Sequence, residues 1–176
     1  MAHLLLGLLL SLSAPQVPRA PYVSTPPDVV DRMLQLAAVS SNDVVYDLGC
    51  GDGRIVIAAA QQFGARGVGV DIDPARIAEA QRNAAQAQVE HLVSFKLEDA
   101  LETDVSEATV VTLYLLSVQN VALRPRLASQ LRPGARIVSH NFGMGDWEAD
   151  EVDTFTSADG QTRTLYLWNA AGAQAR

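Results

Sequence analysis

The segment from Val44 to Pro74 reads VVYDLGCGDGRIVIAAAQQFGARGVGVDIDP, and it decides how the rest of the chain folds. It opens with a short β-branched apolar run, residues 43–48, which is typical of a buried parallel strand. An apolar helical segment follows and ends at Gly64, and a second strand over residues 67–70 ends in Asp71. Between the first strand and the helix lie three glycines at alternate positions: Gly49, Gly51 and Gly53. The segment therefore predicts a β-α-β unit with an acid at the end of its second strand.

The residues of this unit indicate the kind of ligand it binds. Glycines at a strand-to-helix turn let the backbone approach a ligand closely, and Asp71 is placed to accept hydrogen bonds from a ribose diol. Asp47 at the end of the first strand would repel a pyrophosphate but attract a cationic amino-acid group. We therefore expect a positively charged nucleoside without phosphate. A nicotinamide or flavin fold is the alternative, and glycines that merely make a tight turn would not explain both acids.

The sequence at these positions resembles the class I, seven-strand methyltransferases. Residues 47–53, DLGCGDG, match the first motif of that class, and Asp71 matches the acid of the second. The resemblance implies an α/β fold, a Rossmann-like doubly wound, mostly parallel seven-stranded sheet with a C-terminal antiparallel hairpin, and S-adenosylmethionine as cofactor. It also implies that Asp71 holds the ribose hydroxyls, and that the methionine part lies against Gly49, Gly51 and Gly53.

Length and composition limit the other possibilities. The 176 residues suffice for one domain with a core, and they leave little room for a separate substrate domain. The net charge of −7 argues against nucleic acid as a partner, because binding phosphates requires clustered Lys and Arg. The single cysteine, Cys50, excludes an intrachain disulfide and a Cys-rich zinc site, and we interpret it as a small filler of the glycine turn.

The N-terminal residues 1–21 are predicted to lie outside the methyltransferase domain, which we place at residues 22–176. Residues 1–14 form an apolar run that is too short to span a bilayer and suits a signal peptide or membrane anchor, although no Lys or Arg precedes it. A start that takes no part in the fold is the alternative. Residues 15–21 form a Pro-rich linker. We expect the catalytic domain in the cytoplasm, where the cofactor is made.

A short arm, Tyr22 to Pro26, precedes the first strand. We predict Thr25 as the N-cap of a helix, Pro26 as its first residue and Asp28 at the capping-box position. The Tyr-Val-x-Thr-Pro pattern also resembles protein-lysine methyltransferases of the ATP synthase c-subunit type and their prokaryotic relatives, with Ser24 where a proline is common. That resemblance implies that the arm helps to close the site, which makes Tyr22 and Thr25 candidate cofactor-binding residues.

Further along the chain, acids and aromatic residues follow predicted strands. Pro74 begins a helix capped by Asp73, whose Arg76, Glu79 and Arg82 we expect on a solvated face. Asp99 follows a third strand, residues 92–97, where the resemblance implies contact with the adenine amino group; an N-cap for the next segment is the alternative.

The candidate catalytic residues come from the last two parallel strands. The strand at residues 109–113 runs into Tyr114, and the surrounding VTLYLL again resembles the lysine methyltransferases, with Ser117 replacing a proline of relatives. The strand at residues 136–140 ends in His140. We predict Tyr114 and His140 at the site where methyl transfer occurs, whereas core packing and a local hydrogen bond are the respective alternatives.

The remaining C-terminal residues complete the predicted sheet. Residues 141–150 lack helical periodicity, so we expect one crossover helix to be missing, and Asp146 and Trp147 are candidates to cover the pocket. Residues 151–155 and 162–168, joined by a turn, predict the terminal antiparallel hairpin.

The predicted function is methyl transfer from S-adenosylmethionine to a protein lysine, with Tyr22, Tyr114 and His140 along the amine channel. Deprotonating a lysine at pH 7 costs about 4–5 kcal/mol, and an apolar pocket lowers that cost by desolvation. We therefore expect no strong dedicated base. A small-molecule N- or O-methyltransferase and a non-catalytic S-adenosylmethionine-binding protein are the alternatives; the sequence predicts no metal site, and it leaves the oligomeric state open.

Overall fold

The computed structural model describes residues 21–170. The apolar run at residues 1–14, with its predicted signal or anchor role, lies outside these residues, and within them no helix is long and apolar enough to cross a membrane. The elements are, in chain order, α1 (Pro27–Leu36), β1 (Val44–Leu48), α2 (Arg54–Phe63), β2 (Arg66–Asp71), α3 (Pro74–Gln86), β3 (Val93–Leu97), β4 (Val110–Leu113), α4 (Ser117–Gln130), β5 (Arg136–His140), β6 (Glu151–Thr156) and β7 (Thr162–Asn169).

All strands join one seven-stranded sheet in the order β3-β2-β1-β4-β5-β7-β6. The pairs among β1 to β5 are parallel, while β7 lies antiparallel to both β5 and β6. The chain winds outward from β1 to β3, returns to β4 beside β1, and winds outward again. The predicted mostly parallel sheet with a terminal hairpin is confirmed, and so is the missing helix between β5 and β6.

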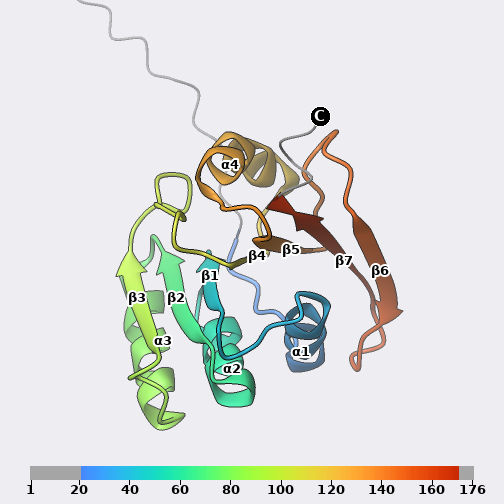
Figure 1. Ribbon diagram of the computed structural model, residues 1–176. Coiled ribbons are helices and arrows are strands. Elements are labelled where there is room, and N and C mark those ends of the chain that lie inside the picture. The colour runs from blue at the N-terminus through green and yellow to red at the C-terminus, as the bar shows by residue number, and fades with distance from the viewer. Residues whose placement is uncertain (1–20, 171–176) are drawn as a thin grey trace, which may run out of the picture.

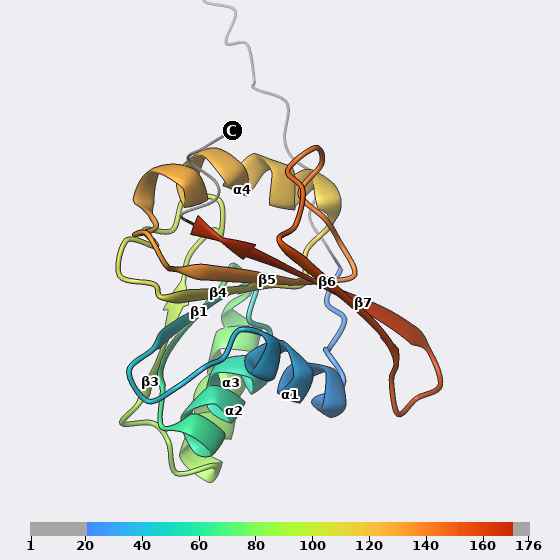
Figure 2. The same cartoon turned by 45° about the vertical axis from the view of Figure 1, so that its right-hand side comes forward.

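The helices cover both faces of the sheet. Figure 2 shows the sheet nearly edge-on, with α4 on one face and α1, α2 and α3 on the other. Each face buries its own apolar cluster, one built around Val45, Val56 and Leu165 and the other around Leu48, Leu127 and Trp168. Because both faces are covered, the central strands β1, β4 and β5 are almost fully buried, while β3 at the edge of the sheet is largely exposed (Figure 1).

The helix ends follow their sequence signals, with one exception. Gly64 ends α2 in the left-handed conformation, and the side chain of Asp73 accepts a hydrogen bond from the Ala75 amide at the start of α3. The prediction for α1 was wrong by one residue, since Pro26 is the N-cap and the helix begins at Pro27. A proline disfavours helical dihedrals in the residue before it, so Pro27 holds Pro26 in an extended conformation, at φ −57° and ψ 149°.

Asp28 consequently has a different partner from the one expected. Its carboxylate accepts hydrogen bonds from the Ser157 hydroxyl and the Ala158 amide, both in the turn between β6 and β7. The first turn of α1 is therefore tied to the C-terminal hairpin.

Candidate active site

The candidate site is a pocket at the carboxyl ends of the parallel strands. It lies where the sheet order reverses between β1 and β4, the position at which open α/β sheets bind their ligands. The residues that line it come from the arm, the glycine turn and the ends of β2, β3 and β4. They include these predicted site residues: Tyr22, Thr25, Asp47, Gly49, Gly51, Asp71, Asp99 and Tyr114.

The glycine turn is shaped for close approach of a ligand to the backbone. Gly49, Gly51 and Gly53 all have positive φ, at 87°, 52° and 79°. The amides of Gly49 and Cys50 both donate to the Val70 carbonyl, at 2.8 and 2.9 Å, which fixes the turn against β2. Gly53 does not line the pocket: a Cβ there would collide with Phe95 and Ala80, so this glycine permits close packing of α2 against α3 and β3.

Asp47 is buried at the base of the pocket. Only 3% of the residue is exposed, and the Thr112 hydroxyl donates to its carboxylate at 2.8 Å. Burial raises the pKa of Asp47 from 3.8 to about 7, and the nearby charges of Asp71 and Asp52 add to the effect while the Thr112 hydrogen bond opposes it. A cation placed beside Asp47 would relieve this cost, so the pocket base fits a positively charged group.

Two more acids at strand ends face the same pocket. One Asp71 oxygen accepts from the Gly51 amide and the other from the Asp73 amide, each at 2.9 Å. Asp99 lines the pocket beyond β3 and also accepts from the Leu101 amide at 3.0 Å, so it makes a local turn bond at the pocket wall.

The arm covers the glycine turn. The Tyr22 ring occupies the space that a Cβ on Gly51 would need, and the Arg76 guanidinium lies 4.5 Å from the centre of that ring. Thr25 is almost fully buried, and its carbonyl accepts a hydrogen bond from Arg54. The sequence did not indicate that Arg54 holds the arm, and it placed Arg76 on a solvated face. Helical periodicity does not show that a distant segment such as the arm crosses the end of a helix.

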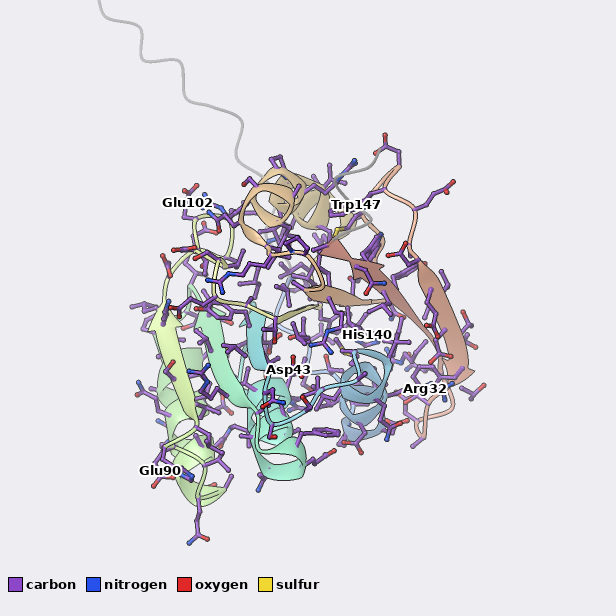
Figure 3. The ribbon with its side chains drawn as sticks, in the orientation of Figure 1. Arg32, Asp43, Glu90, Glu102, His140 and Trp147 are labelled. Atoms are coloured by element: carbon purple, nitrogen blue, oxygen red, sulfur yellow. The ribbon has the colours of Figure 1, made fainter. Side chains whose placement is uncertain are left out.

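Tyr114 and His140 lie together but differ in access to the pocket. Their rings stack with centroids 4.0 Å apart, and Phe142 lies 6.1 Å from Tyr114. Tyr114 lines the pocket, whereas His140 is fully buried behind it at the end of β5 (Figure 3). Neither His140 nitrogen has a hydrogen-bond partner; burial, with a smaller effect from Arg163, lowers the pKa of His140 to about 4, which keeps the imidazole neutral.

The structure also bears on the expectations for Cys50 and for the loop residues Asp146 and Trp147. Burial raises the pKa of the Cys50 thiol, in keeping with a filler of the turn rather than a nucleophile. The expectation that Asp146 and Trp147 cover the pocket was wrong: Trp147 packs against Trp168 in the apolar cluster beside α4 (Figure 3), Asp146 pairs with Arg124 of α4, and neither lines the pocket. Within residues 21–170 no group of His, Cys, Asp and Glu is arranged to hold a metal ion.

The pocket fits S-adenosylmethionine by its own chemistry. The described residues that line it include five aspartates and two arginines, so the wall is net negative, and the glycine turn leaves bare backbone beside the buried Asp47. A pyrophosphate would be repelled there, whereas an ammonium and a sulfonium would be attracted.

Comparison with known proteins agrees with this geometry. Residues 47–151 match the model of the ANTKMT methyltransferase domain. The chain is 47% identical over 153 residues to a protein-lysine N-methyltransferase of Saccharolobus islandicus, covering 86% of this chain and 94% of the relative. It is 29% identical to the ATP synthase c-subunit lysine N-methyltransferase of Xenopus laevis, with 75% of this chain and 58% of that protein covered.

A solved structure is similarly close. The crystal structure of an RNA methyltransferase from Salinibacter ruber in complex with S-adenosylhomocysteine superposes with a TM-score of 0.79 and 53% identity, covering 84% of this chain and 94% of that one. Two of the relatives thus carry names that point to different acceptors.

Proposed function

Because this chain belongs to the ANTKMT methyltransferase domain family, and is an S-adenosylmethionine-dependent methyltransferase, we propose that its acceptor is the ε-amine of a lysine in a protein. The observation that carries the proposal is the negative charge of the pocket wall. A lysine side chain is attracted to such a site, and it is slender enough to reach a pocket that the arm partly covers. An RNA phosphate is repelled by it.

Each predicted cofactor-binding residue has a role that its position supports. Asp47 would hold the ammonium of the methionine part, Asp71 the ribose hydroxyls and Asp99 the adenine amino group. Backbone groups of Gly49 and Gly51 would lie along the methionine part, with Tyr22 and Thr25 above it. Gly53 would contribute only through the packing of α2.

The acceptor side of the pocket would be formed by Tyr114. When bound, S-adenosylmethionine supplies an electrophilic methyl group on a sulfonium for in-line displacement by a neutral amine. Tyr114, backed by the uncharged ring of His140, offers an aromatic surface to the amine. The ring tolerates a protonated amine better than an aliphatic wall would, and it also excludes water from the amine. His140 acts here as a positioning residue for Tyr114, since it does not line the pocket.

Proton removal needs no dedicated base in this arrangement. Losing the lysine proton at pH 7 costs about 4–5 kcal/mol in water, and desolvation of the amine beside the aromatic ring offsets part of it. The negative wall draws the protonated amine to the pocket mouth, and the proton then leaves to solvent there. The alignment of amine and methyl supplies the rest of the rate.

The proposal is tested by following the methyl group. The purified protein is incubated with methyl-labelled S-adenosylmethionine and a lysate of the source organism, which is then divided and treated with ribonuclease or with protease. We expect label that survives ribonuclease, disappears with protease, and maps by mass spectrometry to methylated lysine. The Asp71→Ala variant, in which cofactor binding should be about a hundredfold weaker, is the control and is assayed at a cofactor concentration too low to saturate it.

The other outcomes separate the alternatives. Label that only ribonuclease removes would establish an RNA acceptor, the class named for the Salinibacter ruber protein, and would refute the lysine proposal. Label confined to small molecules would refute it as well.

A further inference from the structure

Arg54, the first residue of α2, connects the glycine turn to the arm. Its Nε donates to an Asp52 carboxylate oxygen at 2.9 Å, and a terminal nitrogen contacts the other oxygen of the same carboxylate. The opposite terminal nitrogen donates to the Thr25 carbonyl at 2.8 Å. One guanidinium therefore joins the glycine turn to the arm, since Thr25 lies 29 positions before Arg54 in the sequence.

The ion pair is held tightly at the pocket wall. Burial opposes ionisation of Asp52, but the hydrogen bonds and charge of Arg54 outweigh it and lower the pKa of Asp52 below its ordinary value. The side chains are 34% and 14% exposed, so solvent screens the pair only in part. Tyr22, which lies on Gly51 and beneath Arg76, is the next anchor of the arm.

Among the described residues, the other anchors of the arm are buried Thr25 and the side chain of Tyr22, which interacts with Arg76 and Asp52. Residues 21–24 are all exposed, although every one of them lines the pocket. A wall made of exposed chain keeps its position only through the groups that anchor it, and a few hydrogen bonds decide whether it is closed.

We propose that Arg54 and Asp52 form a clamp that holds the arm over the glycine turn and thereby retains the cofactor. Arg54 is a positioning residue in this role: it acts through the Thr25 carbonyl and not by transferring or accepting a proton. The clamp sets how fast cofactor and product leave, whereas the reacting atoms are untouched by it. The inference rests on cofactor binding alone and is independent of the acceptor.

Arginine is required because the clamp needs a planar fork. Binding both carboxylate oxygens and a carbonyl on the opposite side uses three donors in fixed directions, and a lysine ammonium cannot reach them together. Arg54→Lys therefore keeps the positive charge but loses the planar arrangement of the three donors.

The test uses the full chain and compares Arg54→Lys and Asp52→Asn with a matched control, Arg126→Lys. Arg126 makes the same kinds of bond, to the Glu102 carboxylate and the Leu101 carbonyl, but in the described part of the chain it neither lines the pocket nor contacts the arm. Calorimetry measures the dissociation constant of S-adenosylhomocysteine, and hydrogen exchange measures protection of the amide of Thr25, the buried residue of the arm.

We expect Arg54→Lys to weaken S-adenosylhomocysteine binding by about tenfold or more and to increase exchange in the arm, with Arg126→Lys unchanged in both. In turnover assays the KM for cofactor should rise while kcat at saturating cofactor stays within about twofold. Wild-type affinity in Arg54→Lys, or an equal loss in Arg126→Lys, would overturn the clamp.

A direct contact between Arg54 and the cofactor carboxylate would produce a similar loss, and decarboxylated S-adenosylmethionine distinguishes the two. If Arg54 acts through the arm, Arg54→Lys weakens binding of this analogue by the same factor as binding of the intact cofactor. If the variant and the wild type bind the analogue equally, the arginine contacts the carboxylate and the clamp is refuted.

Discussion

Replacing Asp47 by Asn should stabilise the protein in the absence of ligand, and the gain should grow as the pH rises. The pKa of Asp47 is raised in the folded chain, so its contribution to stability is fully present below the unfolded value of 3.8 and is lost as the pH rises through about 7. The shift of the Asp47 pKa from 3.8 to about 7 corresponds to about 4 kcal/mol of unfolding free energy in all. About 2–3 kcal/mol of this stability is lost between pH 5 and pH 8.5.

Asn keeps the shape of the side chain and an oxygen that accepts from the Thr112 hydroxyl, but it carries no charge to desolvate. Urea unfolding, followed by tryptophan fluorescence at pH 5 and pH 8.5, measures the difference in unfolding free energy between wild type and variant. We expect the Asn variant to gain about 2 kcal/mol relative to wild type between the two pH values. Glu107→Gln, which changes an exposed carboxylate, is the control and should follow the wild type.

The same measurement can refute the reasoning. If the free-energy difference between wild type and Asp47→Asn is the same at both pH values, Asp47 does not change its protonation in that range, and the buried carboxylate does not oppose folding. Cofactor affinity gives an independent measurement, because in the proposed site the ionised carboxylate of Asp47 holds the cofactor ammonium. Wild-type affinity should therefore rise from pH 5 to pH 8.5, and in Asp47→Asn it should be weaker and nearly flat.

Three further predictions concern other residues of the site and the core. Asp71→Ala should weaken cofactor binding by about a hundredfold, since it removes a ribose acceptor and a bond to the Gly51 amide; calorimetry showing tight binding would contradict the assignment. Tyr114→Phe should retain most of kcat, whereas Tyr114→Ala should lose about tenfold or more because the ring, not the hydroxyl, forms the acceptor wall; equal losses would assign the role to the hydroxyl. Asp43→Asn should lower the free energy of unfolding by about 2–4 kcal/mol, measured with urea at pH 7, because it leaves Arg136 without its buried partner. The pKa of Asp43 is lowered in the fold, so this loss should shrink as the pH falls toward 3 and the wild type also becomes protonated at Asp43. A loss that is independent of pH would show that the charge of Asp43 is not what matters.

Much of the fold could be predicted because its signals are local. The apolar runs of β1, β2 and β4 and the glycines beside them indicated the parallel sheet, and each strand end then placed an acid or an aromatic residue at the same edge. The start of α1 could also have been predicted correctly, since the effect of Pro27 on Pro26 is a rule about neighbours in the chain.

What the sequence could not supply are contacts between distant segments. Arg54 follows the glycine turn and looks like any helix-starting cation until the arm is seen to cross it. Strand alternation places His140 on the same face as Val138, but only the packed structure shows that Tyr114 separates it from the pocket. The prediction that Trp147 covers the pocket failed for the same reason, because the sequence of a loop does not show which part of the molecule its aromatic residue will pack against.

The position of β7 has a consequence for the newly made chain. This strand follows β6 in the chain, yet it inserts between β5 and β6, so the outer part of the sheet cannot form until β7 has been synthesised. The turn that precedes β7 also holds Asp28 at the base of the arm. A nascent polypeptide can therefore form its glycine turn and the Arg54 contact to the arm early, whereas the first turn of α1 gains its bonds to the hairpin turn only after that hairpin emerges.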